Sequence, residues 1–171
     1  MRLRLLSPLL ALVVFAPACA FSAVNRPLVN RYSSQFPREQ SFSLPAPTAL
    51  DAARTALEAI GYEVQALTEE LGQIRTKPRA VATPQVCDCG TWNMSPVTGT
   101  ADSLLLIRVT DAGDNQANVT VEHTCATSFA GQNLYGATTR RETYQCASRG
   151  IIEKDFWSTM ERIVEARANA E

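Results

Sequence analysis

The chain has 171 residues, of which 46% are hydrophobic and 19% charged, with 16 basic against 17 acidic side chains. This length is typical of one domain with an additional segment, and the near-zero net charge excludes the usual kind of strongly basic nucleic-acid-binding protein. The hydrophobic share is too high for an intrinsically disordered chain, and these residues are too scattered for a protein with several membrane spans. We therefore expect one folded domain and no nucleic-acid partner.

The N-terminal residues have the pattern of a secretory signal peptide. Arg2 and Arg4 supply positive charge, the run 5–15 is almost wholly apolar, and small residues follow it at 16–20. The apolar run is too short for a lasting membrane span. We therefore expect residues 1–18 to be removed during export.

Cys19 follows small residues, as does the acylated cysteine of bacterial lipoprotein signals, which this segment resembles. The chain contains five cysteines, and an odd cysteine in an exported protein needs an explanation. Acylation of Cys19 leaves four cysteines for two disulfides. The resemblance, with Ala20 next, implies attachment to the outer membrane, facing the periplasm; the alternative is a soluble periplasmic protein that loses Cys19 with its signal. Residues 19–46 contain Ser and Pro without apolar periodicity, so we expect the lipidation site and then a flexible tether.

The folded domain is expected to begin with a helix near residue 47. Thr48 has the properties of an N-cap, Asp51 stands three residues later as in a capping box, and Gly61 provides a stop signal. One face carries apolar residues at spacings of three and four, namely Leu50, Ala53, Leu57 and Ile60. This face predicts packing against a core.

Strand patterns follow the first helix. The alternating segment 62–67, the turn at 69–72 and the segment 73–77 predict a β-hairpin. Residues 79–102 have the least regular pattern, with prolines that interrupt strand pairing. Three more strands are expected at 103–109, 116–127 and 135–146.

A second helix is expected from about residue 150. Glu153 and Asp155 in its first turn suit the positive end of a helix. Its apolar face consists of Ile152, Phe156, Met160, Ile163 and Val164. The element order predicts a single α+β domain over 47–168, with an antiparallel sheet of about five strands and both helices packed on one face.

Two segments carry a resemblance to known proteins. The helix end ALEAIGYEV with the following EELGQIRTK resembles BamC-like outer-membrane lipoprotein domains, in which a helix packs on a sheet. The run CASRGIIEKDFW is similar to small envelope lipoproteins of unassigned function. The resemblance implies a helix-grip-like fold and a role in envelope assembly or scaffolding, and it implies no catalytic residue.

The remaining cysteines, Cys87, Cys89, Cys125 and Cys146, are expected to form disulfides, as is usual in exported proteins. A bond between Cys87 and Cys89 requires a tight, strained turn, because an extended strand holds their side chains too far apart. We therefore expect each of these two to bond either Cys125 or Cys146, with the connectivity open. The alternative is a thiolate–imidazole metal site that includes His123. The Cys-x-Cys spacing and the single histidine argue against it, so we expect neither a metal nor a cofactor.

Catalytic motifs such as G-x-S-x-G and H-E-x-x-H do not occur in the sequence. His123 lies on the apolar face of its strand and is expected to be a core or rim residue with one hydrogen bond rather than a general base. Trp92, beside Met94, is expected to be an exposed anchor for a partner, with a cap over the sheet as the alternative.

The sequence thus predicts a non-enzymatic, exported envelope lipoprotein. We expect a scaffolding or assembly module that binds another envelope protein or membrane-associated component and reaches the membrane through its N-terminal lipid. The alternative is a periplasmic protein that binds a small ligand, either a lipid or a metal. A third hypothesis is an envelope enzyme with a site around His123 and the cysteines.

Overall fold

The computed structural model describes residues 37–92, 95–132 and 138–169. Cys19 and Met94, two of the predicted functional residues, lie outside these ranges. The helices are α2 (Ala46–Ala59) and α3 (Ile151–Ala168), with one 3₁₀ turn, η1 (Glu69–Leu71). The strands, in chain order, are β1 (Glu39–Phe42), β2 (Val64–Thr68), β3 (Gln73–Thr76), β4 (Arg79–Thr83), β5 (Cys87–Asp88), β6 (Thr91–Trp92), β7 (Ser95–Pro96), β8 (Gly99–Gly113), β9 (Gln116–Gln132) and β10 (Thr138–Ser148).

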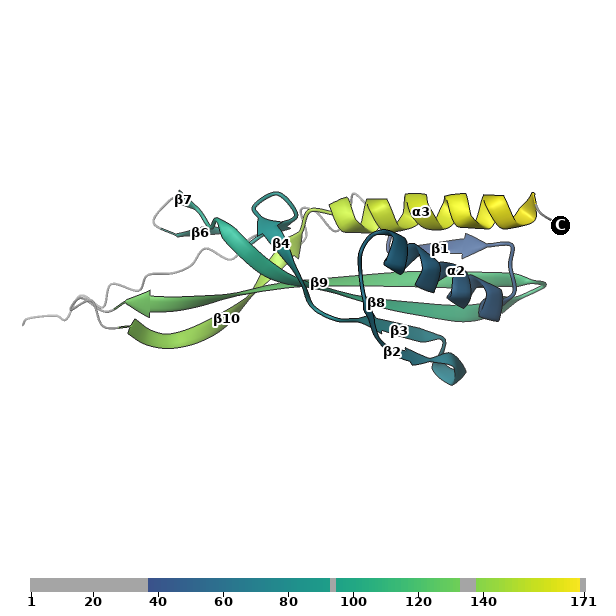
Figure 1. Ribbon diagram of the computed structural model, residues 1–171, viewed down its shortest axis with the longest axis horizontal. Coiled ribbons are helices and arrows are strands. Elements are labelled where there is room, and N and C mark those ends of the chain that lie inside the picture. Colours follow the sequence, from purple (N-terminus) through teal and green to yellow (C-terminus); the bar gives the residue numbers. More distant parts are fainter. Residues whose placement is uncertain (1–36, 93–94, 133–137, 170–171) are drawn as a thin grey trace, which may run out of the picture.

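The antiparallel pair β8 and β9 runs through the length of the fold (Figure 1). Asp114 and Asn115 join the two strands with φ values of 50° and 58°, the backbone that tight hairpin turns with a matching twist require. The helices lie near this turn, and β10 extends toward the other end. The long hairpin pairs directly with β1, β3, β4 and β10.

Eight strands form one sheet in the order β2-β3-β8-β9-β10-β5, with β4 also paired to β8 and β1 also paired to β9. Each long strand therefore changes partner along its length. β8 pairs with β4 over 99–103 and with β3 over 106–108. β9 pairs with β1 over 117–120 and with β10 from Cys125 onward. In β8 the change from β4 to β3 falls between residues 103 and 106, and in β9 the change from β1 to β10 falls between residues 120 and 125.

One hydrophobic core joins the helices to the sheet. Alternate residues of β8 point into it, because successive side chains of a strand point to opposite faces. The helices pack against each other, and both contact β9. The main buried contributors are Leu50, Ala53, Leu57, Leu105, Ile107, Val109, Val119, Val121, Ile152, Phe156 and Met160. A second, smaller cluster consists of Val81, Cys87, Cys89, Val97, Ala101 and Cys125.

The structure confirms the α+β class, the antiparallel sheet and the formation of two disulfides. The sheet has eight strands rather than about five, because β1 adds to it from the expected tether, and β4 and β5 add to it from the segment with the least regular pattern. Neither helix in the described ranges is both long and apolar enough to cross a membrane.

Two predictions at the start of the domain are wrong. β1 lies inside the segment 19–46 that was expected to be a tether, and Phe42 is buried in the core, so the sheet begins before residue 47. The helix begins at Ala46 without a side-chain cap, so Thr48 lies within it. Asp51 closes no capping box, because its carboxylate accepts hydrogen bonds from Arg54 and Arg167.

Candidate functional site

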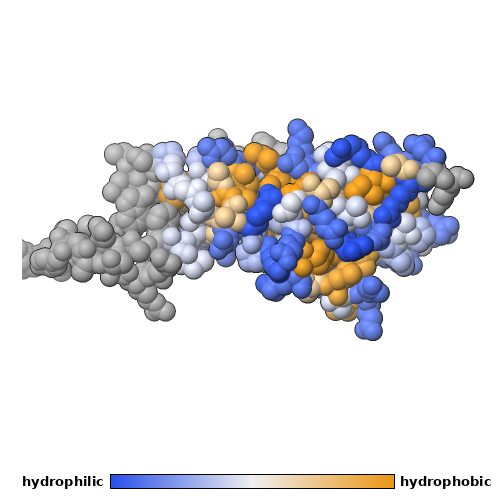
Figure 2. Space-filling view, in the orientation of Figure 1, coloured by the Kyte–Doolittle hydropathy of each residue, from blue (hydrophilic) through white to orange (hydrophobic). Residues whose placement is uncertain are grey.

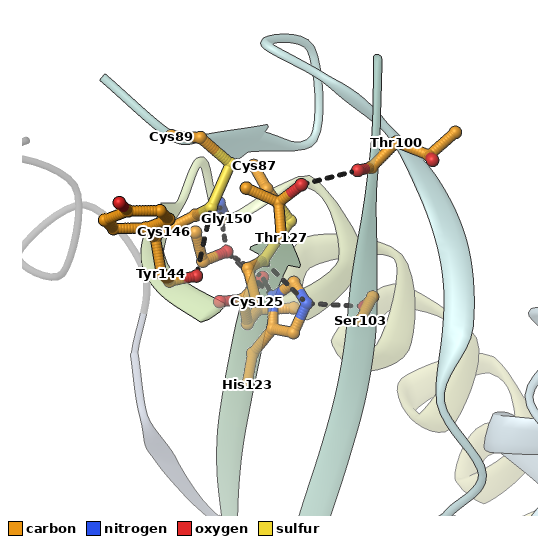
Figure 3. Close-up of a disulfide and its surroundings, with 12 residues drawn as sticks. Cys87, Cys89, Thr100, Ser103, His123, Cys125, Thr127, Tyr144, Cys146 and Gly150 are labelled. Carbon is orange, nitrogen blue, oxygen red and sulfur yellow. Dashed lines mark hydrogen bonds and ion pairs between the residues drawn. A yellow bond between two sulfur atoms is a disulfide. The ribbon is translucent and has the colours of Figure 1, made fainter. Parts of the chain in front are cut away.

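Two disulfides join the segment after β4 to the long strands (Figure 3). Cys87 bonds Cys125 with an S–S distance of 2.05 Å, and Cys89 bonds Cys146 at 2.03 Å. The expected pairing of each loop cysteine with a strand cysteine is therefore confirmed, and the structure supplies the connectivity. Because the bonds link residues 38 and 57 positions apart, each should stabilise the fold by about 2–4 kcal/mol through restriction of the unfolded chain.

His123 lies beside the first disulfide, at the centre of a group of polar side chains. Its side chain is 1% exposed. Its Nε2 atom lies 2.7 Å from the Ser103 hydroxyl and 3.4 Å from the Cys125 sulfur. Its Nδ1 atom lies 2.8 Å from the Ser148 hydroxyl and 3.0 Å from Glu153 Oε2. The imidazole is therefore buried, as expected, but has several polar partners rather than one.

The polar group continues from Ser103 to Tyr62, which belongs to the core cluster between the sheet and the helices. The Ser103 hydroxyl lies 2.5 Å from the buried Tyr62 hydroxyl. The Arg79 guanidinium lies 4.0 Å from the centre of the Tyr62 ring and donates to the Ile60 carbonyl. We call the set Tyr62, Ser103, His123, Ser148 and Glu153 the buried network. It crosses the middle of β8 and β9, where both strands change partner.

Burial and hydrogen bonding set the charges of this network. Burial raises the pKa of Glu153, but the hydrogen bond and charge of His123 and the hydrogen bond from Ser148 outweigh it and hold the pKa of this carboxyl below its usual value. Burial raises the pKa of Tyr62, so its phenol stays neutral near neutral pH. The network thus holds a carboxylate at the start of α3 and a phenol at the opposite end.

Ser103, His123 and Glu153 are connected like the residues of a hydrolase triad, in which an imidazole lies between a hydroxyl and a carboxylate and contacts both. A nucleophilic serine must reach an external substrate. Ser103 is 0% exposed, and its hydroxyl is already bonded to Tyr62. This geometry offers no nucleophile to solvent, so it favours a structural role for the network.

Cys87, His123 and Cys125 place three donor atoms within 4.8 Å of one another. Two thiolates and one imidazole suit zinc or copper. The two sulfurs are bonded to each other, however, and a thiolate is the form of cysteine that binds a metal. The oxidised protein therefore offers His123 as the one unmodified donor of this cluster.

The predicted partner anchor at Trp92 and Met94 receives no test from the structure. The backbone of Trp92 belongs to β6 and pairs with Ser95 of β7. The side chain of Trp92 is not among the described parts, and Met94 lies outside the described residues. Their role in partner binding stays a prediction.

A groove of about 830 Å³ lies between the first half of α2 and the β2–β3 hairpin. Its apolar lining includes Leu50 from α2, Leu67 and Leu71 from the hairpin, and Val109 from β8. Leu67 is 41% exposed and Leu71 63% exposed. Figure 2 shows hydrophobic surface in this part of the molecule, with hydrophilic surface beside it. The groove thus presents large apolar side chains to solvent.

Gly72 holds the hairpin end of the groove close to β8. Its carbonyl accepts a hydrogen bond of 2.8 Å from the Val109 backbone nitrogen. Gly72 has a φ of +58°, and a Cβ atom there would lie 2.1 Å from the Val109 carbonyl oxygen. Glycine suits this position because it adopts a positive φ readily and has no Cβ atom to collide with the Val109 carbonyl.

Acidic side chains surround the apolar part of the groove. The lining contains Asp51, Glu69, Glu70 and Asp111. Hydrogen bonds from Arg54 and Arg167 hold the pKa of Asp51 below its usual value. Within the part of the chain that the structure describes, the other three have no ion-pair partner at the groove.

The sequence reasoning missed this groove and most of the buried network. The sequence predicted the turn at 69–72 but not its part in a groove. The available signal was Leu71, a large apolar residue within a turn. Ser103 and Glu153 had no local signal, because they lie far from His123 in the sequence.

No protein-family model matches the chain, and the search of curated proteins found no match. The resemblance to BamC-like domains therefore receives no support from these comparisons.

Proposed function

We propose that this protein is an exported, non-enzymatic binding module of the cell envelope that engages another envelope component through the groove. In this proposal residues 1–18 are removed and a lipid on Cys19 attaches the chain to the outer membrane, facing the periplasm. Both helices cover one face of the sheet, because their buried residues share one core with β8 and β9. The observation that carries the proposal is the exposure of Leu67 and Leu71 in the groove.

The disulfides support the export part of the proposal. Disulfides persist in oxidising compartments and are rare in the cytosol. Cys87 and Cys125 are almost completely buried, so their bond is part of the packed structure rather than an exposed reactive pair. Together with the signal-peptide pattern of residues 1–18, this favours folding outside the cytoplasm.

The distribution of polar and apolar groups supports binding rather than catalysis. The groups with catalytic chemistry, Ser103 and His123, are enclosed in the buried network. The groove instead exposes leucine side chains, and exposed apolar surface of this kind marks sites of interaction with other molecules. A partner that covers Leu71 removes its apolar surface from water, which stabilises the complex.

The volume of the groove favours one second candidate. A space of about 830 Å³ is within the range of sites that bind small organic ligands, which is about 300–1,000 Å³. A lipid with an apolar chain is therefore the alternative occupant.

Site-specific photocrosslinking in living cells tests the proposal. A photoreactive residue replaces Leu71 in the groove, and the matched control carries it at Ile151, which is also exposed and apolar but lies on α3 outside the groove lining. We expect a defined adduct with another envelope protein from position 71 and not from position 151. A lipid-sized adduct supports the alternative, and identical products from both positions contradict a binding role for the groove.

The lipid anchor has its own test. Labelling with radioactive palmitate should modify the parent protein and leave Cys19→Ser unlabelled. A mature chain that begins at residue 19 without an acyl group would show that the anchor is wrong.

A further inference from the structure

We infer that the groove receives a basic, amphipathic peptide segment of the partner. This inference rests on the proposed function and deepens it by assigning the chemistry of the partner. It follows from two properties of the groove, namely its exposed apolar side chains and the sign of the charges around them.

The apolar lining sets the first requirement. Leu50, Leu67 and Val109 come from three separate elements, and Leu71 extends from the turn. Apolar side chains on one side of a peptide can contact this lining while the opposite side stays in water. The segment that fits is therefore amphipathic.

The charged lining sets the second requirement. The groove contains four carboxylate residues, Asp51, Glu69, Glu70 and Asp111, and a single cationic residue, Arg54. Four negative and one positive group give a formal charge of −3. Lysine or arginine beside the apolar residues of the segment complements this charge.

Arg54 is already counted in this charge and is held by acidic residues of its own helix. Its guanidinium lies 2.8 Å from Asp51 and 3.7 Å from Glu58, so it is already paired within α2. Asp51 also accepts a hydrogen bond from Arg167. Glu69, Glu70 and Asp111 form no ion pair with any described residue, and they lie on the hairpin and β8 side of the groove. A cationic side chain of the partner is expected on that side.

The same charges disfavour acidic occupants. A fatty acid or an anionic phospholipid places negative charge against these carboxylates, and juxtaposed like charges weaken binding. The negative charge of the groove attracts a basic segment, which speeds its approach and stabilises the complex. The groove therefore favours ligands that combine positive charge with apolar surface.

The test uses the oxidised protein, purified after export, and two fluorescent synthetic peptides. The peptides share one pattern of leucines and carry lysine or glutamate at their polar positions. Anisotropy titrations should show at least about tenfold tighter binding of the lysine peptide. Its affinity should fall as salt is added, because salt screens exposed charges.

Charge-reversal variants locate the interaction. Glu69→Lys combined with Glu70→Lys should weaken binding of the lysine peptide by about tenfold or more and strengthen binding of the glutamate peptide. The matched control combines Glu161→Lys with Glu165→Lys, which makes the same charge change at exposed positions of α3 outside the groove lining. We expect this control to change the affinity by less than about twofold at moderate salt.

Several outcomes overturn the inference. These are equal affinity for the two peptides, equal loss in the control variant, or no binding of either peptide. Groove-dependent self-association identifies a second copy as the occupant, and groove-dependent binding to phosphatidylcholine vesicles identifies a lipid. If photocrosslinking at position 71 still captures a protein while the peptides fail, the peptide chemistry is wrong and the proposed function stands. If that crosslink is also absent, the proposed function fails as well.

Discussion

Replacement of Ser103 by alanine tests the buried network most sharply. The Ser103 hydroxyl lies 2.5 Å from the Tyr62 hydroxyl and 2.7 Å from His123 Nε2. Tyr62 is 2% exposed and the His123 side chain 1% exposed, so water cannot readily replace the lost hydroxyl. The variant therefore leaves two buried polar groups each short of a partner.

The expected loss in the free energy of unfolding follows from these two buried groups, the Tyr62 hydroxyl and the His123 imidazole. An unsatisfied buried donor or acceptor costs about 1–3 kcal/mol. Both groups lose one contact, but His123 retains its bonds to Ser148 and Glu153. We therefore expect Ser103→Ala to lower the free energy of unfolding by about 2–4 kcal/mol.

A double-mutant cycle separates this cause from a simple loss of packing. Tyr62→Phe removes the phenol that Ser103→Ala leaves without its partner. The double variant should therefore be less destabilised than the sum of the two single variants, with a coupling of about 1–2 kcal/mol. The measurement is urea unfolding of the oxidised protein, followed by tryptophan fluorescence.

Ser158→Ala is the control for loss of a hydroxyl. Ser158 is exposed on α3 and donates only to the Asp155 carbonyl in its own helix. Its replacement should change stability by less than about 0.5 kcal/mol. A similarly small effect of Ser103→Ala, or strict additivity with Tyr62→Phe, would refute the account of the network.

Three further predictions concern pH, the disulfides and the glycine that supports the groove. Because the pKa of Glu153 is lower in the folded protein than its ordinary value of 4.5, its carboxylate stabilises the fold above about pH 4.5 and this contribution disappears as the pH falls through the folded pKa. Glu153→Gln should therefore flatten the acid limb of stability measured by urea midpoints, and parallel curves for parent and variant would contradict this assignment. Replacement of both Cys89 and Cys146 by alanine should lower the free energy of unfolding by about 2–4 kcal/mol, whereas an unchanged value would mean that this bond is not formed. Gly72→Ala should lower the thermal midpoint much more than Gly113→Ala, because both positions have positive φ but only a Cβ at Gly72 meets a backbone atom. Equal shifts would show that the contact with β8 is unimportant.

The elements with strong periodicity could be predicted from the sequence. The apolar face of α2 at Leu50, Ala53 and Leu57 is buried as its spacing indicated, and so is the face of α3 at Phe156 and Met160. Helical packing is visible locally because one face of a helix recurs every three or four residues. The disulfides were predictable for a different reason, because the expected compartment favours them and the Cys87–Cys89 alternative is sterically poor.

The extra strands could not be predicted, because they depend on distant partners. Four residues of β1 pair with β9, which lies about eighty positions further along the chain. β4 follows Pro78 and stops before Pro84, so its local pattern indicated a break rather than a strand. In both cases the long strands β8 and β9 supply the edge that makes a short strand stable.

The candidate sites were less predictable than the fold. His123 was recognised as a buried strand residue, but its hydroxyl partner Ser103 and its carboxylate partner Glu153 come from β8 and α3. The groove exists only where α2 lies beside Leu71 and the hairpin turn. Such sites depend on the register and packing of the whole domain, which local patterns do not specify.

Export and oxidation are the central claim, and mass spectrometry of the protein isolated directly into an alkylating agent tests it. The account predicts a mature chain without residues 1–18 in which peptides of Cys87 and Cys125, and those of Cys89 and Cys146, are joined by disulfides. It also predicts that none of these four cysteines carries the alkyl label. A cytosolic chain that retains Met1 and carries the label on all four cysteines would contradict it.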